Sequence, residues 1–350
     1  DSYYESILLD SKPIDDRAVA ATINKFSKIR GLRIRDQRRT VELMKKSTNS
    51  GLPYFTKRRN VVNSTLPVEL SGDYQILKGK SWKSAAVLGW RGQEGGPELE
   101  DVKQRVVWMF PLGVNIEELR LYQPLIEACQ SQDLVPAWVS MEAVDKRITQ
   151  LFDTKGRHDD IICTDFSKFD QHFNADMQLG AQRILEGICT NDSTFRYWMK
   201  EVFPVKYNIP LLYAEDGIRT GAHGMGSGSG GTNADETLAH TALQFESAIK
   251  AGKQLNTNSM CLGDDGLLTY PGINVEDVVK SYSSHGQEMN IDKQYVSKVD
   301  CTYLRRWHHT DYRIQGVCVG VYSTYRALGR LAEQERHYDP KIWGPKMVAL

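Results

Sequence analysis

Long apolar runs and paired cysteines are both missing from this 350-residue chain. No apolar stretch approaches the ~18 residues that a membrane-spanning helix needs, so the sequence predicts no membrane partner. The six cysteines form no C-x-x-C pair and no metal-ligand spacing with the eight histidines. This pattern argues against a structural zinc and favours buried free thiols in a reducing compartment. We also expect no signal peptide, internal repeat or low-complexity tail.

Net charge is absent as well, because 44 basic residues balance 44 acidic ones. The total charge therefore does not indicate a nucleic-acid-binding protein, but the charges are unevenly distributed. Residues 17–60 contain 13 Lys and Arg against 2 Asp and Glu. A polyanionic partner favours such an excess, because each neutralised phosphate releases counterions. A solvated helical surface balanced by acidic segments elsewhere is the alternative.

The most informative stretch that is present is an acidic hairpin at residues 259–270. Two short apolar runs flank Gly263-Asp264-Asp265-Gly266, a pattern that predicts a β-hairpin with an acidic turn. The second carboxylate adds repulsion and does not help the turn. A divalent cation such as Mg²⁺ removes that repulsion, because it takes oxygen ligands. Considered alone, the hairpin favours the alternative of a solvated turn, and the metal-binding interpretation depends on a second acidic site.

A second acidic site lies upstream of the hairpin. Residues 161–164 predict a short buried strand that leads into Asp165 and Asp170, and residues 171–187 predict a helix. Asp170 is placed to cap that helix. Asp165 instead ends a buried strand, where an unpaired carboxylate is costly. If this strand and the hairpin share a sheet, their carboxylates can hold two Mg²⁺ ions ~3.5–4 Å apart for nucleotidyl transfer.

Two further segments have the character of anion-binding elements. Lys103 and Arg105 share one face of a predicted strand at 102–111, where two cations suit a triphosphate. An exposed edge strand is the alternative. Residues 221–231 contain six glycines and lead into a helix predicted at 232–251. Such a loop presents backbone N–H groups to an anion or a nucleotide. A flexible linker is the alternative. Without the Walker A lysine, this is not a P-loop.

Taken in their order along the chain, these segments resemble the motifs of viral RNA-dependent RNA polymerases. The resemblance is strongest to those of picobirnaviruses, and next to those of partitiviruses. The resemblance covers residues 47–307. It places Asp165-x4-Asp170 as motif A, Ser227-Gly228-x3-Thr232 as motif B, Gly263-Asp264-Asp265 as motif C, Asp292-Lys293 as motif D, Tyr303-Leu304-Arg305-Arg306 as motif E, Lys103-x-Arg105 as motif F and Ser50-Gly51-Leu52-Pro53 as motif G.

The resemblance implies an α+β, right-hand polymerase fold. Its fingers would span residues 1–155, and its palm, an antiparallel sheet flanked by helices, residues 156–306 with a fingers insertion near 190–220. Residues 307–350 would begin a thumb that is either truncated or reduced. The implied activity is template-directed RNA synthesis from NTPs, which replicates and transcribes the genome of a double-stranded RNA virus. Implied partners are the RNA template, the nascent strand, NTPs and capsid protein, in the virion interior or host cytoplasm.

The resemblance also assigns roles to residues. It implies two Mg²⁺ or Mn²⁺ ions on Asp165, Asp264 and Asp265, with Lys293 as the proton donor to pyrophosphate. The implied NTP-binding residues are Lys103, Arg105, Asp170, Ser227, Gly228, Thr232 and Asn233. The implied RNA-binding residues are Ser50, Gly51, Pro53, Arg305 and Arg306.

One departure concerns the ribose contact. Glu236 stands where the family has Asn or Asp four residues after the motif B threonine, so Asn233, Asp235 and Glu236 all remain candidates. Two other functions also remain open. A reverse transcriptase shares the paired aspartates but normally has an aromatic residue where this chain has Gly263. An RNA-binding protein that keeps the fold without activity would not need the carboxylates.

Overall fold

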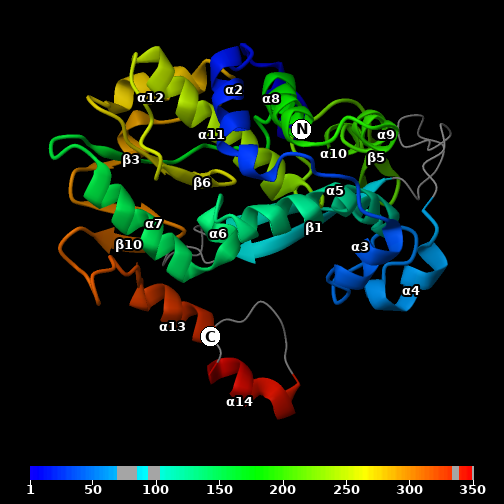
Figure 1. Ribbon diagram of the computed structural model, residues 1–350. Coiled ribbons are helices and arrows are strands. Elements are labelled where there is room, and N and C mark those ends of the chain that lie inside the picture. The colour runs from blue at the N-terminus through cyan, green and yellow to red at the C-terminus, as the bar shows by residue number, and fades with distance from the viewer. Residues whose placement is uncertain (69–84, 94–102, 333–338, 349–350) are drawn as a thin grey trace.

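The computed structural model describes residues 1–68, 85–93, 103–332 and 339–348. Its strands form three sheets in which nearly every neighbouring pair is antiparallel, and helices cover them (Figure 1). This arrangement agrees with the α+β class expected from the sequence. No helix in the described ranges is long and apolar enough to cross a membrane.

The central sheet has the strand order β6-β7-β3-β8 and is antiparallel throughout. Its strands are β3 (Ile161–Thr164), β6 (Met260–Leu262), β7 (Asp265–Leu268) and β8 (Tyr295–Ser297). Strand β3 is buried on both faces, which explains its unbroken apolar run. Ile162 packs into one core, and Ile161 and Cys163 pack into another, as the alternation of a strand requires.

Helices form the two layers that enclose this sheet (Figure 1). The larger core is built with α2 (Asp16–Lys25), α8 (Ala175–Ile188), α11 (Thr232–Lys250) and α12 (Val275–Ser283). The smaller core lies against α7 (Met141–Thr154) and the strand β9 (Asp300–Tyr303). Helix α11 has buried residues on nearly all sides, so both its apolar and its polar side chains face other parts of the protein.

The second sheet has the order β2-β1-β4-β5 and carries the basic strand. It consists of β1 (Ala86–Gln93), β2 (Lys103–Met109), β4 (Leu211–Ala214) and β5 (Gly217–Arg219). The third sheet, β11-β10-β9, adds β10 (Arg306–His309) and β11 (Val321–Tyr322).

The third sheet departs from the local sequence pattern in two places. The sequence of residues 303–307 predicts the beginning of a strand, but Leu304 and Arg305 form the turn between β9 and β10, with positive φ of 52° and 63°. Residues 313–322 alternate in a way that also predicts a strand. Only Val321–Tyr322 is a strand, because Ile314 and Val317 close a tight turn on themselves.

The remaining helices lie around these layers. They are α1 (Ser2–Glu5), α3 (Gln37–Leu43), α4 (Arg58–Thr65), α5 (Leu112–Ser131), α6 (Pro136–Val139), α9 (Ser193–Glu201), α10 (Val205–Asn208), α13 (Thr324–Ala332) and α14 (Pro340–Val348), with 3₁₀ turns at Ser6–Leu8, Ser27–Ile29 and Ile291–Lys293. Helices α13 and α14, drawn in red, extend away from the rest of the chain (Figure 1).

Candidate active site

Three aspartates meet at one end of the neighbouring strands β3 and β7. Thr164 pairs with Gly266, so the antiparallel register places Asp165 opposite Asp265 at the next position. Asp264 lies in the turn between β6 and β7, beside Asp265. This turn has only two residues, Gly263 and Asp264, because Asp265 already belongs to β7. The sheet thus brings together the carboxylates that the sequence predicted to meet.

These carboxylates repel one another in a partly desolvated place. Burial, together with the charges of Asp264 and Asp165, raises the pKa of Asp265 to about 7, although the Leu304 N–H, which donates to this carboxylate at 2.8 Å, opposes the shift. Burial and the charge of Asp170 raise the pKa of Asp264. A divalent cation fits this donor set, because it supplies the missing positive charge and prefers oxygen ligands. In the described part of the chain, however, no three His, Cys, Asp or Glu side chains form a preassembled metal cluster.

Side chains that belong to no recognised motif fix the backbone of this site. The Gln294 side chain accepts a hydrogen bond from the Asp165 N–H (2.8 Å) and donates one to the Asp165 carbonyl (2.9 Å). From α11, the Thr237 hydroxyl accepts from the Gly263 N–H at 3.0 Å. Burial lowers the pKa of His240 to about 4, so its neutral ring donates from Nδ1 to the Gly263 carbonyl at 2.8 Å. The sequence carried no signal for these contacts beyond the helical spacing of Thr237 and His240.

Asp170 does not cap α8, so the structure excludes the capping alternative, and the helix begins later than the residue 171 expected from the sequence. The helix begins at Ala175, and Asn174 caps it by accepting from the N–H groups of Asp176 and Met177. Asp170 instead accepts a short hydrogen bond from the Ser227 hydroxyl in the glycine-rich loop. Its carboxylate is therefore held beside the strand-end aspartates, and its charge raises the pKa of Asp264.

The structure separates the three candidates for the ribose contact. Asp235 is fully buried and binds Lys206 (3.0 Å) and the hydroxyls of Tyr122 (2.7 Å) and Tyr207 (2.6 Å). Asn233 accepts from the Trp138 indole at 2.8 Å. Glu236 faces Asp170. Burial, the charge of Asp170 and a hydrogen bond between the two carboxyl groups raise the pKa of Glu236 well above its usual range.

The glycine-rich loop, residues 221–231, is clamped on several sides and is not a free linker. The Trp108 N–H on β2 donates to the Ser227 carbonyl at 2.9 Å. Gly228 has a φ of +145°, and a Cβ there would collide with the Trp108 carbonyl. On the α5 side, buried Glu118 accepts from the Ser229 hydroxyl and from the Gly230 N–H at 3.1 Å. The Thr232 hydroxyl closes the loop with bonds of 3.3 Å to the carbonyls of Gly226 and Ser229.

The predicted cationic residues have different surroundings. Arg105 is exposed on β2, and its charge lowers the pKa of Asp264. Lys103 begins β2, and its side chain lies outside the described part of the structure. Lys293 is exposed at the end of a 3₁₀ turn. Arg305 lies in the β9–β10 turn, where its charge lowers the pKa of Asp265.

Three of the predicted RNA-binding residues contact other parts of the protein. The Arg306 guanidinium donates two hydrogen bonds to Asp145 of α7, at 2.7 and 3.1 Å, and so ties β10 to that helix. Ser50 is fully buried, and its hydroxyl accepts from the Thr56 N–H at 3.2 Å. Gly51 has a φ of +63° and packs against the Phe110 carbonyl, where a side chain does not fit. Pro53 is exposed at the surface of this loop.

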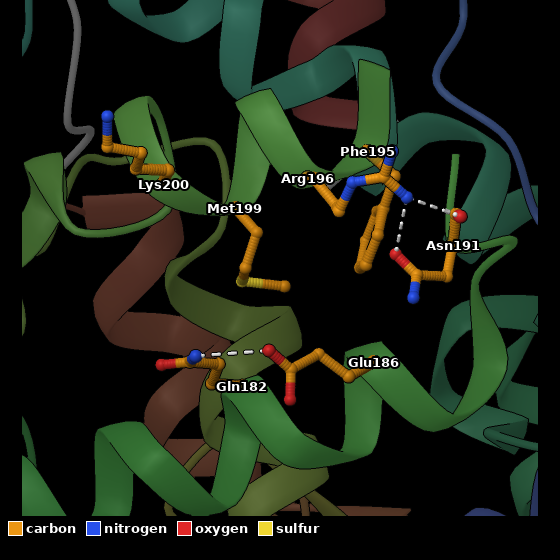
Figure 2. A pocket seen from close by; sticks show the side chains of 7 residues that line it. All are labelled: Gln182, Glu186, Asn191, Phe195, Arg196, Met199 and Lys200. Atoms are coloured by element: carbon orange, nitrogen blue, oxygen red, sulfur yellow. Dashed lines mark hydrogen bonds between the residues drawn. The ribbon is translucent and has the colours of Figure 1, made fainter. Parts of the chain in front are cut away.

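A surface pocket of about 470 Å³ lies between α8 and α9 and contains none of the predicted site residues (Figure 2). It is lined by Gln182, Glu186, Asn191, Phe195, Arg196, Met199 and Lys200. Its polar groups bond one another: Gln182 donates to Glu186 at 3.1 Å, and Arg196 donates to the Asn191 carbonyl at 2.9 Å. This pocket is therefore separate from the carboxylate site.

Comparisons with known proteins agree with this geometry. The family model described as viral RNA-dependent RNA polymerase matches residues 17–314. A protein of human picobirnavirus (strain Human/Thailand/Hy005102), named "Potential RNA-dependent RNA polymerase", is 62% identical over 100% of this chain, which spans 66% of that protein. Two crystal structures of a human picobirnavirus RNA-dependent RNA polymerase are 60% identical, each with a TM-score of 0.92 over 99% of this chain. One is an insertion-loop deletion mutant, and the chain covers 69% and 67% of them. The chain belongs to the viral RNA-dependent RNA polymerase family and has its right-hand polymerase fold.

Proposed function

We propose that this chain carries the catalytic site of a template-directed RNA polymerase that replicates and transcribes a viral double-stranded RNA genome. The observation that carries the proposal is the meeting of Asp165 with Asp264 and Asp265 across strands β3 and β7. Three carboxylates at adjoining strand ends destabilise the metal-free site, as the raised pKa of Asp265 indicates. Bound cations would offset this repulsion, and carboxylates grouped in this way are typical of sites that hold two metal ions.

In this proposal Asp165, Asp264 and Asp265 hold two divalent cations, Mg²⁺ or Mn²⁺. When bound, these ions supply the positive charge that nucleotidyl transfer between a primer 3′-OH and an NTP α-phosphate requires. The two hydrogen bonds between the Gln294 side chain and the Asp165 backbone fix the position from which the Asp165 carboxylate would reach the ions. The hydrogen bonds from α11 to Gly263 do the same for Asp264.

Other residues of the chain bind the nucleotide and the RNA. Arg105, with Lys103, neutralises the triphosphate, because a guanidinium forms charge-assisted hydrogen bonds to phosphate oxygens. Lys293 is the proton donor to the leaving pyrophosphate. Pro53 and Arg305 lie at exposed turns, from which they contact RNA. We assign Ser50, Gly51 and Arg306 an indirect part in RNA binding, since their contacts shape the loops that carry these neighbours.

The sugar is recognised by the group of polar side chains around Asp170. Ser227 donates to Asp170, and Glu236 lies on its other side, so Asp170 is held where it accepts a hydrogen bond from a ribose 2′-OH. Gly228, Thr232 and Asn233 shape the surrounding loop and helix start. A deoxynucleotide lacks the 2′-OH and forfeits this hydrogen bond to the half-buried Asp170 carboxylate, at a cost of ~1–3 kcal/mol.

We further assign residues 1–155 to the fingers, 156–306 to the palm with a fingers insertion near 190–220, and 307–350 to the start of the thumb. The partners are then the RNA template, the nascent strand and NTPs. Capsid protein and a place inside the virion or in the host cytoplasm are consistent with a polymerase of a double-stranded RNA virus.

Primer extension on an RNA template tests the proposal. The chain is expected to incorporate NTPs in preference to dNTPs when Mg²⁺ is present, and Asp264→Ala is expected to abolish incorporation. Asp216→Ala, a change in the exposed β4–β5 turn, is the matched control and is expected to keep activity. Preference for dNTPs would favour a reverse transcriptase instead. Binding of RNA without incorporation would favour an inactive polymerase-fold protein.

A further inference from the structure

The short helix α6 supplies a hydrogen bond to Asn233, one of the predicted nucleotide contacts at the start of α11. The Trp138 indole N–H donates to Asn233 Oδ1 at 2.8 Å. Trp138 is itself held in place, because its ring packs against the larger core and its carbonyl accepts from the Gln130 side chain of α5 at 2.7 Å. The indole is therefore a fixed donor beside Asn233.

This hydrogen bond decides which end of the Asn233 amide is left for a ligand. An indole N–H can only donate, so the atom that it contacts must be the amide oxygen. The amide nitrogen lies against the turn of the β6–β7 hairpin. A Cβ at Gly263 would be 3.5 Å from Asn233 Nδ2 and 3.3 Å from a carboxyl oxygen of Glu236. Asn233 therefore presents N–H donors, and not an acceptor, beside the residue that precedes Asp264.

These donors complement the acceptor that Asp170 provides. Glu236 neighbours both groups, since it lies beside Gly263 with Asn233 and its carboxyl group interacts with that of Asp170. A hydroxyl has one proton to donate and lone pairs with which to accept. A ribose 2′-OH in this space can donate to Asp170 and accept from the Asn233 amide at the same time. A deoxyribose can do neither.

We propose that Trp138 is a positioning residue for sugar selection: its indole N–H holds the Asn233 oxygen away from the nucleotide and keeps the amide N–H groups turned towards the ribose. The inference rests on the proposed function and deepens it. Trp138 itself does not touch the substrate. The terminal torsion of an asparagine is broad and roughly two-fold, so without the indole N–H the amide rotates and its oxygen also faces the ribose. Sugar discrimination then falls, while the metal-binding carboxylates stay in place.

Trp138→Phe tests the inference, because it removes the indole N–H and keeps an aromatic ring against the core. Trp198→Phe is the matched control, since the Trp198 indole donates to the Glu117 carbonyl at 2.7 Å, away from the predicted sugar site. Two ratios are measured in the full chain: the equilibrium affinity for ATP over 2′-deoxy-ATP, and kcat/KM for the same pair. Trp138→Phe should lower both ratios about 3- to 10-fold, the effect of one hydrogen bond, and Trp198→Phe should leave them unchanged.

A double-mutant cycle with Asn233→Ala distinguishes positioning from any other effect of Trp138. Asn233→Ala should lower both ratios by itself, because it removes the amide that faces the sugar. Adding Trp138→Phe to Asn233→Ala should then lower them no further, since the group that the indole orients is already gone. A further loss in the double variant would show that Trp138 does not act through Asn233, and it would overturn the inference.

The remaining outcomes separate this inference from the function on which it rests. If the unmodified chain binds and incorporates neither nucleotide, the proposed function fails, and the inference fails with it. If the unmodified chain discriminates between them and Trp138→Phe discriminates equally well, only the role of Trp138 is overturned. Equal losses in Trp138→Phe and Trp198→Phe, together with a lower Tm in both, would show a general effect of packing and would also overturn that role.

Discussion

At the scale of single residues, the site depends on carboxylates that differ in their surroundings. Asp165, Asp264 and Asp265 repel one another at the strand ends, whereas Asp170 is hydrogen-bonded by Ser227 and Glu236. Asp235, next to Glu236 in the sequence, forms a buried ion pair with Lys206. Carboxylates with such different partners perform different tasks, and substitutions distinguish them.

Asp170→Ala should compress the preference for NTPs over dNTPs, measured as the ratio of their kcat/KM values. The loss of one hydrogen bond between the sugar and this half-buried carboxylate should reduce that ratio about ten- to a hundredfold. Tm should change little, because Asp170 does not cap α8. The control is Asn174→Ala, which removes the real cap and should cost ~1 kcal/mol of stability without affecting sugar preference. A fixed ratio in Asp170→Ala would remove Asp170 from sugar selection.

Asp265→Asn should weaken the pH dependence of stability in the metal-free chain. The folded-state pKa of Asp265 is raised from 3.8 to about 7, so the folded state binds more protons than the unfolded state between these values. The stability that this proton provides is present below the lower value and is lost as the pH rises through the higher one.

The measurement is Tm by circular dichroism in EDTA, at about pH 5 and about pH 8, for both proteins. The unmodified chain should lose more stability across this interval than Asp265→Asn. Added Mg²⁺ should restore stability to the unmodified chain at the higher pH, because the cation replaces the proton. Identical pH profiles with and without the substitution would show that the pKa of Asp265 is not raised in the folded chain.

The sequence predicted the carboxylates but not the groups that hold them. Asp165 and Asp264 were identifiable because unpaired acids at strand ends are unusual. The role of Asp170 was ambiguous, because the sequence predicted a helix from residue 171, and an acid directly before a helix resembles a cap. Gln294 gave no signal, and Thr237 gave none beyond its helical spacing from His240. Their side chains bond backbone atoms that are distant in sequence, and such contacts exist only once the chain has folded.

At the scale of elements, local pattern predicted most boundaries well. Strand β3 was expected at 161–164 and found at Ile161–Thr164, and helix α11 was expected at 232–251 and found at Thr232–Lys250. An unbroken apolar run between acidic residues defines β3, and helical periodicity with glycines at 231 and 252 defines α11. The β9–β10 turn was missed because Leu304 and Arg305 adopt positive φ without glycine or asparagine.

Helix α11 connects the turn of the central hairpin to the core, and Thr237→Val tests this connection. The substitution keeps the shape of the side chain but leaves the buried Gly263 N–H without its acceptor, at a cost of ~1–3 kcal/mol. Because Asp264 follows Gly263, kcat should fall while the KM for NTP stays nearly constant.

Thr241→Val, one turn further along α11, provides the control. Its hydroxyl bonds the helix carbonyl of Thr237 at 2.7 Å and the Cys261 thiol, and it does not reach the turn. Its kcat should match that of the unmodified chain. Equal kcat values in Thr237→Val and Thr241→Val would show that the turn is held without help from α11.

At the scale of the whole molecule, the net charge is zero, but the basic side chains of residues 17–60 fall into two groups within the described structure, those with acidic partners and those without. Within the basic segment 17–60, some arginines already have acidic partners: Arg17 pairs with Asp15, Arg35 with Glu127 and Arg39 with Glu42. In contrast, Lys45, Lys57 and Arg59 are exposed and have no ion pair within the described part of the chain. They lie next to the predicted motif G loop, in the sequence on either side of residues 50–53.

Lys45, Lys57 and Arg59, which have no acidic partner within the described residues, should therefore make the contacts with RNA phosphates. Each contact that is lost lowers the slope of log K against log salt by roughly 0.7 for single-stranded RNA, so replacing Lys45, Lys57 and Arg59 by Gln should lower it by roughly 2. Replacing Arg17, Arg35 and Arg39 by Gln removes the same formal charge but should lower the slope less, because acids already neutralise these side chains. Fluorescence anisotropy with a labelled RNA across a salt series measures both slopes. If the two triple variants show equal slopes, net charge alone attracts the RNA, and if neither differs from the unmodified chain, the segment is a solvated surface.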